Sequence, residues 1–395
     1  MKKQLEKPFE NLRRKDNTPF DPDIVKNWYK ARAFVLDKLK DVAFLPSDNS
    51  HLHVVVDVDK DDKQLSPLMM AVVRQIALSA HYLNFFEGNE QEPPRNRTFI
   101  TLVSKHNNLR EELDKEEYLC NLLKFCQYKE GDSKPDNEDS YVDLEFHVVE
   151  VWNNGEDFRF SEQNVIDFCN NKPDDEIFSI DTRMADFASR MYELGADFDN
   201  LPAEDIHCTQ RYSAALDVFR YKKLVSSSQK IFDDKMNQAS LSNVKERISN
   251  ILCADCFRIR EKSIEECKKN GAYRSSKREL WAAFNEPLSK SEHARWVVEK
   301  LILGYRPMNA EERYHYESLQ FEGNGKQKQK DYCKSLKRSD KDPSHIDLCS
   351  YRDLRRINPD DLKYDSFLML AIPIILHKVN KKSLLEKLFA FLYEN

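Results

Sequence analysis

The segment SEHARWVVEKLILGYRP, residues 291–307, carries three chemically distinct side chains at helical spacing. His293, Trp296 and Lys300 stand at i, i+3 and i+7, so on a helix they share one side. An indole can stack on a nucleobase, an ammonium can meet a phosphate, and an imidazole can donate or accept a hydrogen bond. The trio is therefore compatible with a nucleotide site. The alternative interpretation, which the helix taken alone favours, is structural, with Trp296 in the core and His293 bonded to a backbone carbonyl.

A second group of reactive side chains lies in DVDKDDKQLSP, residues 57–67. Dinucleotide-binding sheets place G-x-G-x-x-G at the turn after the first strand, where glycine lets the backbone approach the pyrophosphate. This turn has no glycine and carries four carboxylates, Asp57, Asp59, Asp61 and Asp62, which repel a pyrophosphate. We therefore expect no ordinary NAD binding at this turn and interpret the domain as a scaffold or dimerisation platform. A divalent metal held by these aspartates, in a metal-dependent nucleotide-processing enzyme, is the alternative hypothesis.

The cysteines do not form a recognisable metal motif. Cys253 and Cys256 make one C-x-x-C pair, and Cys267 follows further along. A structural zinc site needs four ligands, normally from two such pairs, and no second pair occurs in the sequence. We interpret the three thiols as buried and free. A P-loop, an H-E-x-x-H motif and a nucleophile elbow are also missing from the sequence. We predict no catalytic residue, no metal and no cofactor, and we favour binding over catalysis.

The elements that must position these residues begin with an alternation of apolar strands and amphipathic helices. We predict strands at residues 53–58, 98–104, 145–152 and 176–181, and helices at 67–82, 108–126, 162–169 and 183–194. Such an alternation predicts an α/β Rossmann-like fold with a parallel sheet and helices on both faces. We interpret residues 128–140 as a polar surface loop and residues 21–43 as a helical lead-in.

Beyond residue 209 the pattern is helical. We expect helices at 210–224 and 243–270 and a small helical unit at 285–380. The lysine-rich stretch at 323–343 is interpreted as a mobile insertion. The most apolar run, FLMLAIPIIL at 367–376, is far too short to span a bilayer and is interpreted as a buried helix. The predicted domains are 1–44 (helical lead-in), 45–207 (α/β domain), 208–284 (helical connector) and 285–395 (mostly helical C-terminal domain).

Two parts of the C-terminal domain carry a family resemblance. LSKSEHARWVVEKLILGYRP, at 288–307, resembles the first half of the RyR domain, the small helical module repeated in ryanodine receptors. SHIDLCSYRDL at 344–354 and LKYDSFLMLAIPIIL at 362–376 resemble its second half, in the same order. TQRYSAALDVFRYKKL at 209–224 is similar to the helix that follows a TrkA-N-like Rossmann domain in bacterial RyR-domain proteins. The resemblance implies that 45–207 is TrkA-N-like and that 285–395 is an RyR-like ligand-binding domain.

The resemblance also implies a function, because bacterial RyR modules are proposed to sense nucleotide-derived signals in conflict systems, including defence against phage. It implies a soluble sensor or effector that binds an ADP-ribose-like molecule or a cyclic nucleotide. The predicted ligand-binding residues are His293, Arg295, Trp296, Glu299, Lys300, Tyr305, Arg306, His345, Tyr351 and Asp353.

Each of these residues has an expected role under the resemblance. Trp296 and Tyr305 would stack the base. Three cations, Arg295, Lys300 and Arg306, would meet phosphates, and Asp353 or Glu299 would accept ribose hydroxyls. TrkA-N-like domains commonly dimerise, so the resemblance is compatible with a homo-oligomer. A non-catalytic assembly protein is the third hypothesis.

Composition limits the other classes. The 395 residues carry a net charge of -6, which argues against general nucleic-acid binding although a local basic groove remains compatible with it. The nine cysteines show no disulfide-framework spacing and indicate a reducing compartment. The N-terminal residues are charged and lack an apolar core, so we expect no signal peptide, no membrane association and a cytoplasmic location.

Overall fold

The computed structural model of the chain divides into two compact units. It describes residues 5–11, 18–61, 64–89, 91–106, 109–116, 119–138, 140–153, 158–186, 188, 244–269, 284–339, 342–362, 365, 369, 372 and 376. Unit 1 contains residues up to 48, residues 167–292 and residues from 363 onward, and unit 2 contains residues 49–166 and 293–362. The predicted helix at 210–224 lies outside the described residues, as does most of the one at 183–194. Met369, Ile372 and Leu376, from the apolar C-terminal run, are helical and buried.

Unit 2 is built on a five-stranded sheet in which every strand pair is parallel. The strand order is β6 (Gln127–Glu130), β7 (Leu144–Val149), β5 (Thr98–Val103), β2 (His53–Asp57) and β8 (Phe158–Phe160). The parallel sheet confirms the predicted α/β class. A typical dinucleotide-binding sheet has the order 3-2-1-4-5-6, with three strands on each side of the centre. Here β2 is the first strand of the sheet along the chain, and only β8 lies on the side of β2 away from β5.

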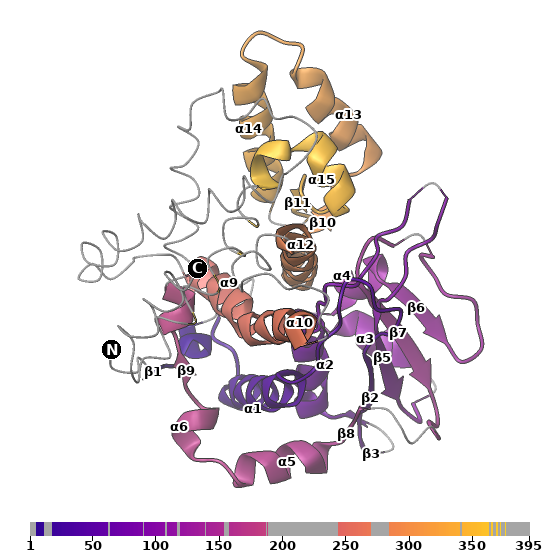
Figure 1. Cartoon of the computed structure of the whole chain (residues 1–395), viewed down its shortest axis with the longest axis vertical. Coiled ribbons are helices and arrows are strands. Elements are labelled where there is room, and N and C mark those ends of the chain that lie inside the picture. Colours follow the sequence, from indigo (N-terminus) through magenta and orange to yellow (C-terminus); the bar gives the residue numbers. More distant parts are fainter. Residues whose placement is uncertain are drawn as a thin grey trace. The chain divides into compact units, whose positions relative to one another are not determined.

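The apolar residues of this sheet explain why it forms. Val54, Val55 and Val56 of β2 are fully buried, as expected for a central strand of a parallel sheet. Helix α2 (Pro67–Ser79) contacts β2 (Figure 1). It begins where Ser66 accepts a hydrogen bond from Met69 N and where proline occupies the first turn, which are both ordinary helix-start features.

The predicted strand at 176–181 is wrong. Residues Asp174–Ile177 form the short helix α6, and only β9 (Ile180–Asp181) is extended, paired antiparallel with β1 (Leu5–Glu6) in unit 1. Pro173 and three acidic residues in the first turn favour a helix start here. The sheet instead contains β6, which lies mostly in the predicted polar loop, and β8. Both are edge strands, and their sequences are too polar or too short to be predicted as strands from apolar runs.

The remaining helices follow the predicted pattern with two interruptions. Unit 1 contains η1 (Pro8–Asn11), α1 (Pro22–Leu39), α9 (Val244–Asp255) and α10 (Phe257–Lys269), while α5 (Glu162–Asn170) begins in unit 2 and ends in unit 1. Unit 2 contains α3 (Leu109–Lys115) and α4 (Cys120–Phe125), together with the small hairpin β3 (Asp59–Asp61) and β4 (Gln64–Leu65). The predicted helices at 108–126 and 243–270 are therefore each broken into two. Leu113 and Leu123, one on each piece of the first, are both buried.

The C-terminal part of the described chain is mostly helical. Its elements are α12 (Asn285–Ile302), β10 (Arg306–Pro307), α13 (Ala310–Leu319), α14 (Gly325–Lys337), β11 (Ser344–His345), α15 (Tyr351–Ile357) and η4 (Pro359–Asp361). β10 and β11 pair in parallel, and α13 and α14 form a helical hairpin (Figure 1). The interpretation of 323–343 as a mobile insertion is therefore wrong, because most of it is helix α14. Ring contact between His315 and Tyr332, with centroids 4.6 Å apart, joins the two helices.

Candidate functional site

The polar residues at the start of the α12 motif are held by internal bonds. Glu292 pairs with Arg260 at 2.8 Å in unit 1, and both side chains are almost completely buried. His293, the first residue of α12 in unit 2, has its Nε2 atom 2.9 Å from the carbonyl oxygen of Cys349. This is the backbone bond expected of a structural histidine. Neither Glu292 nor His293 presents its polar atoms to solvent.

Arg295, Glu299 and Lys300 form one ion-paired group on α12. Arg295 Nη1 lies 2.7 Å from Glu299 Oε2, and Lys300 Nζ lies 2.7 Å from Glu299 Oε1. Burial alone raises the pKa of Glu299, but the adjacent charges and hydrogen bonds of Lys300 and Arg295 outweigh it and lower that pKa to about 2. Glu299 is therefore ionised at neutral pH, and the group carries one net positive charge.

Trp296 is at the centre of an aromatic cluster. Its indole stands edge-on to His345, with centroids 4.9 Å apart and planes at 79°. Lys300 Nζ lies over the indole, 5.4 Å from the ring centroid. His293 lies nearly parallel to the indole at 6.1 Å, and Tyr305 stands edge-on to His345 at 6.4 Å. The structure thus brings together five of the predicted ligand-binding residues, and a sixth, Tyr351, contacts them through His293.

His345 is a neutral hydrogen-bonding group in this cluster. Burial lowers its pKa well below the usual range, and the positive charges of Lys337 and Lys300 lower it further. The backbone N–H of Asp347 donates to His345 Nδ1 at 3.2 Å. The proton of the neutral imidazole therefore resides on Nε2, which makes that atom a donor.

Asp347 is a buried carboxyl that the sequence did not single out. Asn358 Nδ2 donates to Asp347 Oδ1 at 2.9 Å and to Asp361 Oδ2 at 2.8 Å. Burial, followed by the negative charge of Asp361, raises the pKa of Asp347 to about 7. Two carboxyls that approach one another share a proton more readily than either ionises alone. Nothing in the amino-acid pattern around residue 347 signals this pair.

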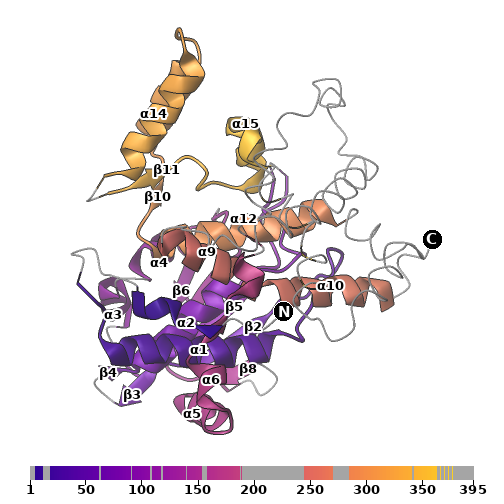
Figure 2. The same ribbon diagram turned by 90° about the vertical axis from the view of Figure 1, so that its left-hand side faces the viewer.

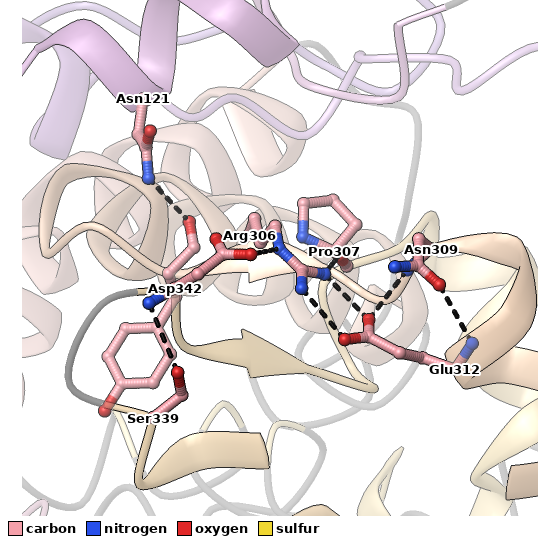
Figure 3. A network of polar contacts seen from close by, with 8 residues as sticks. Asn121, Arg306, Pro307, Asn309, Glu312, Ser339 and Asp342 are labelled. Carbon is pink, nitrogen blue, oxygen red and sulfur yellow. Dashed lines mark hydrogen bonds and ion pairs between the residues drawn. The ribbon is translucent and has the colours of Figure 1, made fainter.

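Arg306 is engaged by two carboxylates (Figure 3). Its Nη1 lies 2.7 Å from Glu312 Oε2 and its Nε lies 2.7 Å from Asp342 Oδ2. Glu312 also completes a capping box with Asn309 at the start of α13. Hydrogen bonding to Glu312 raises the pKa of Arg306 above its already high ordinary value. The guanidinium predicted to meet a phosphate is therefore already paired with two acidic residues.

Tyr351 and Asp353 lie in the first turn of α15. Tyr351 is buried and stands edge-on to His293 at 5.7 Å. Asp353 accepts a hydrogen bond from Ser350 Oγ at 3.1 Å, while its own N–H donates to that hydroxyl. The first residue belongs to the aromatic cluster, and the second belongs to the helix cap.

Three side chains of residues 49–166 bind the backbone around the aromatic cluster. Asn121 of α4 donates to the Tyr305 carbonyl at 3.3 Å (Figure 3). Tyr141 donates its hydroxyl to the Leu348 carbonyl at 3.1 Å. Glu87 accepts from the N–H of Tyr351 at 2.5 Å and from the next N–H at 3.2 Å, which caps α15. The loops that carry Tyr305 and His345 are thus tied to the sheet region of the same unit.

The aspartates after β2 are largely occupied. Arg159 of β8 donates two hydrogen bonds to Asp57, at 2.8 and 3.1 Å. Asp59 accepts hydrogen bonds from Ser104 Oγ and from the N–H of Lys105. Asp61 is described, whereas Asp62 lies outside the described residues. Within the described part of the chain, no three histidine, cysteine or acidic side chains are arranged to hold a metal. Cys253, Cys256 and Cys267 are buried, as predicted, and none of them forms a disulfide with another described cysteine.

Comparisons with known proteins leave the resemblance as a prediction. The chain matches no family model, no curated protein and no solved structure. Among the helices of the described residues, none has the length and apolarity to cross a membrane.

Proposed function

We propose that the chain is a sensor or effector that binds a nucleotide-derived small molecule at the Trp296 cluster. The proposal includes an RyR-like domain at residues 285–395 and a TrkA-N-like domain at residues 45–207. It also includes a role in signalling during antiviral defence and a homo-oligomeric state as an option. The observation that carries the proposal is the set of side chains around one indole. Trp296, Tyr305 and His345 supply stacking surfaces and a hydrogen-bond donor, and Lys300 supplies a cation.

The geometry supports a specific mode of binding. Lys300 lies over the Trp296 ring, so a base that stacks there displaces the ammonium. Arg295 continues to neutralise Glu299, which leaves Lys300 able to turn to a phosphate of the ligand. His345 Nε2–H donates to an acceptor on the base. Stacking on one aromatic ring contributes roughly 1–3 kcal/mol, as measured by substitution.

The charge near the indole favours a ligand with little negative charge. Arg306 is neutralised by Glu312 and Asp342, and Arg295 by Glu299. Lys300 is thus the predicted cation best placed to change partners. A nucleotide with one exposed phosphate, such as a cyclic nucleotide, suits this site better than an open pyrophosphate like ADP-ribose.

A thermal-shift screen of the purified protein tests the proposal. The probes are cyclic mononucleotides and dinucleotides, ADP-ribose, cyclic ADP-ribose, NAD and ATP. A ligand at one hundred times its dissociation constant adds about 2.7 kcal/mol of stability. We expect a stabilising hit among the cyclic nucleotides that Trp296→Ala abolishes and that Trp152→Ala, a second aromatic substitution in unit 2, retains. No hit, or a hit that Trp296→Ala leaves intact, contradicts the proposal.

The alternative of a metal-dependent enzyme gains no support from the aspartate cluster. Arg159 already neutralises Asp57, and Asp59 is bonded to Ser104 and Lys105. Metal-dependent turnover of a nucleotide that Asp57→Ala and Asp59→Ala both abolish would revive it. A non-catalytic assembly protein would instead show a defined complex and no small-molecule shift.

A further inference from the structure

The helix that replaces the expected mobile insertion concentrates positive charge on a chain of net charge -6. Helix α14 and the arginine after it contain five lysines, one arginine and a single acidic residue, Asp331. In both views the α13–α14 hairpin projects away from the parallel sheet of the same unit (Figures 1 and 2). A cluster of positive charge therefore lies on a protruding element of the unit.

Four of these lysines form a row along α14. Their positions, 326, 330, 334 and 337, are separated by four, four and three residues, which keeps them on one side of a helix. All four are exposed. At a rise of about 1.5 Å per residue, the row extends over about 16 Å. The opposite flank of α14 faces α13, where Gln329 donates to the Tyr316 carbonyl and Tyr332 contacts His315.

Two aromatic side chains of the same hairpin are directed into solvent. Phe321, in the turn between the helices, is 85% exposed, and Tyr314 of α13 is 76% exposed. These are the highest values among the exposed large hydrophobic residues of the described chain. A basic row and exposed aromatics on one element are the combination that proteins use to bind single-stranded nucleic acid, because lysines meet phosphates and rings stack on unpaired bases.

We propose that the α13–α14 hairpin binds single-stranded nucleic acid, with the lysine row along the phosphates and Phe321 and Tyr314 stacked on bases. A linear row of cations fits a linear polyanion. A lipid surface fits less well, because a membrane-binding helix needs apolar side chains beside its lysines. The exposed residues between the lysines of α14 are polar, including Gln327, Asp331 and Ser335. Because the chain as a whole has a net charge of -6, we expect no general nucleic-acid binding over the rest of its surface.

Fluorescence anisotropy with a labelled mixed-sequence oligonucleotide tests the proposal on the full chain. Each neutralised phosphate of a single strand contributes about 0.7 to the slope of log K against log salt, so four lysines predict a slope near -3. Lys330→Gln/Lys334→Gln should halve that slope and lower affinity at about 50 mM salt by roughly tenfold. The matched control, Lys124→Gln/Lys134→Gln, removes two exposed lysines elsewhere in unit 2 and should bind as the wild type does.

The competing partners are separated in the same experiment. Tyr314→Ala/Phe321→Ala should weaken binding of the single strand, and the wild type should bind it more tightly than the duplex of the same sequence. Circular dichroism should show unchanged helix content for every variant, since all the substituted side chains are exposed. Equal binding by the lysine variant, a preference for duplex, or binding of phosphatidylserine vesicles or polyglutamate without the oligonucleotide would overturn the proposal. Absence of binding at low salt would also overturn it.

Discussion

Nζ of Lys300 lies 2.7 Å from Oε1 of Glu299. The same ammonium lies over the Trp296 indole. Lys300 therefore contacts both a buried carboxylate and the ring at the centre of the aromatic cluster. Because Arg295 holds the other oxygen of Glu299, the carboxylate stays neutralised when Lys300 moves. Under the proposed function, Lys300 would turn from Glu299 to a phosphate of the ligand while Arg295 stays paired with the carboxylate.

Glu299→Gln should strongly destabilise the protein. Arg295 is 1% exposed, and the substitution removes the carboxylate that lies 2.7 Å from this buried guanidinium. Breaking such a pair costs about 3–5 kcal/mol, which urea unfolding followed by circular dichroism would detect. The control Glu311→Gln, on the exposed side of α13, should change stability by less than about 0.5 kcal/mol. Similar unfolding midpoints for the two variants would contradict the buried role of Glu299.

Lys300→Met should separate stacking from phosphate recognition. The methionine keeps an unbranched apolar chain over the indole but has no charge to offer a ligand. We expect affinity for a cyclic nucleotide to fall by roughly tenfold, about 1.4 kcal/mol, while affinity for the corresponding nucleoside stays the same. Isothermal titration of both ligands measures the difference, and an equal loss for nucleoside and nucleotide would exclude a phosphate contact by Lys300.

Arg306→Ala should leave nucleotide affinity within about twofold of the wild type, because Glu312 and Asp342 already engage the guanidinium. It should lower stability instead, by about 1–3 kcal/mol, since Glu312 loses its main partner. The same titration and unfolding measurements check both parts. A large loss of affinity with unchanged stability would place Arg306 in the ligand site, as the sequence suggested.

Asp347 should make stability fall as the pH rises toward neutrality. Its pKa is raised to about 7 in the folded chain, mainly by burial and then by Asp361, against about 3.9 when unfolded. The folded state therefore binds more protons than the unfolded state between these values, and its stability decreases with rising pH across that window.

Asp347→Asn should remove this decrease. The asparagine oxygen still accepts from Asn358 Nδ2, so the bond at 2.9 Å can persist without a titrating group. Urea unfolding at several pH values from about 4 to about 8 compares the two proteins. Parallel stability curves for the wild type and the variant would show that Asp347 does not titrate in this window.

The sequence predicts the parts of the fold that depend on strong apolar patterns. The valines of β2 and the spacing of α12 were sufficient to place a central parallel strand and the helix that carries Trp296. Edge strand β6 is not predicted from the sequence. Its outer residues, Lys129 and Glu130, are polar and at least partly exposed, and such residues are typical of a loop. The sequence predicts a strand instead of α6 because the adjacent apolar residues Ile177 and Phe178 are typical of a strand. The acidic residues that precede them favour the start of a helix.

The candidate site was only partly predictable. Helical spacing joined His293, Trp296 and Lys300, with Tyr305 close behind them in the sequence. The family resemblance added His345, and all five lie in one aromatic cluster. Spacing cannot show which cations are already neutralised, because Glu312 and Asp342 reach Arg306 only through the folding of β10 and α13. The raised pKa of Asp347 depends on burial, which no local pattern encodes.

The most direct test of the account is the affinity of the wild type, Trp296→Ala and Trp152→Ala for the best cyclic nucleotide, measured by isothermal titration. We predict that Trp296→Ala weakens binding by at least tenfold, since about 1–3 kcal/mol of stacking is lost, whereas Trp152→Ala binds like the wild type. Equal affinities for all three proteins would contradict a ligand site at Trp296.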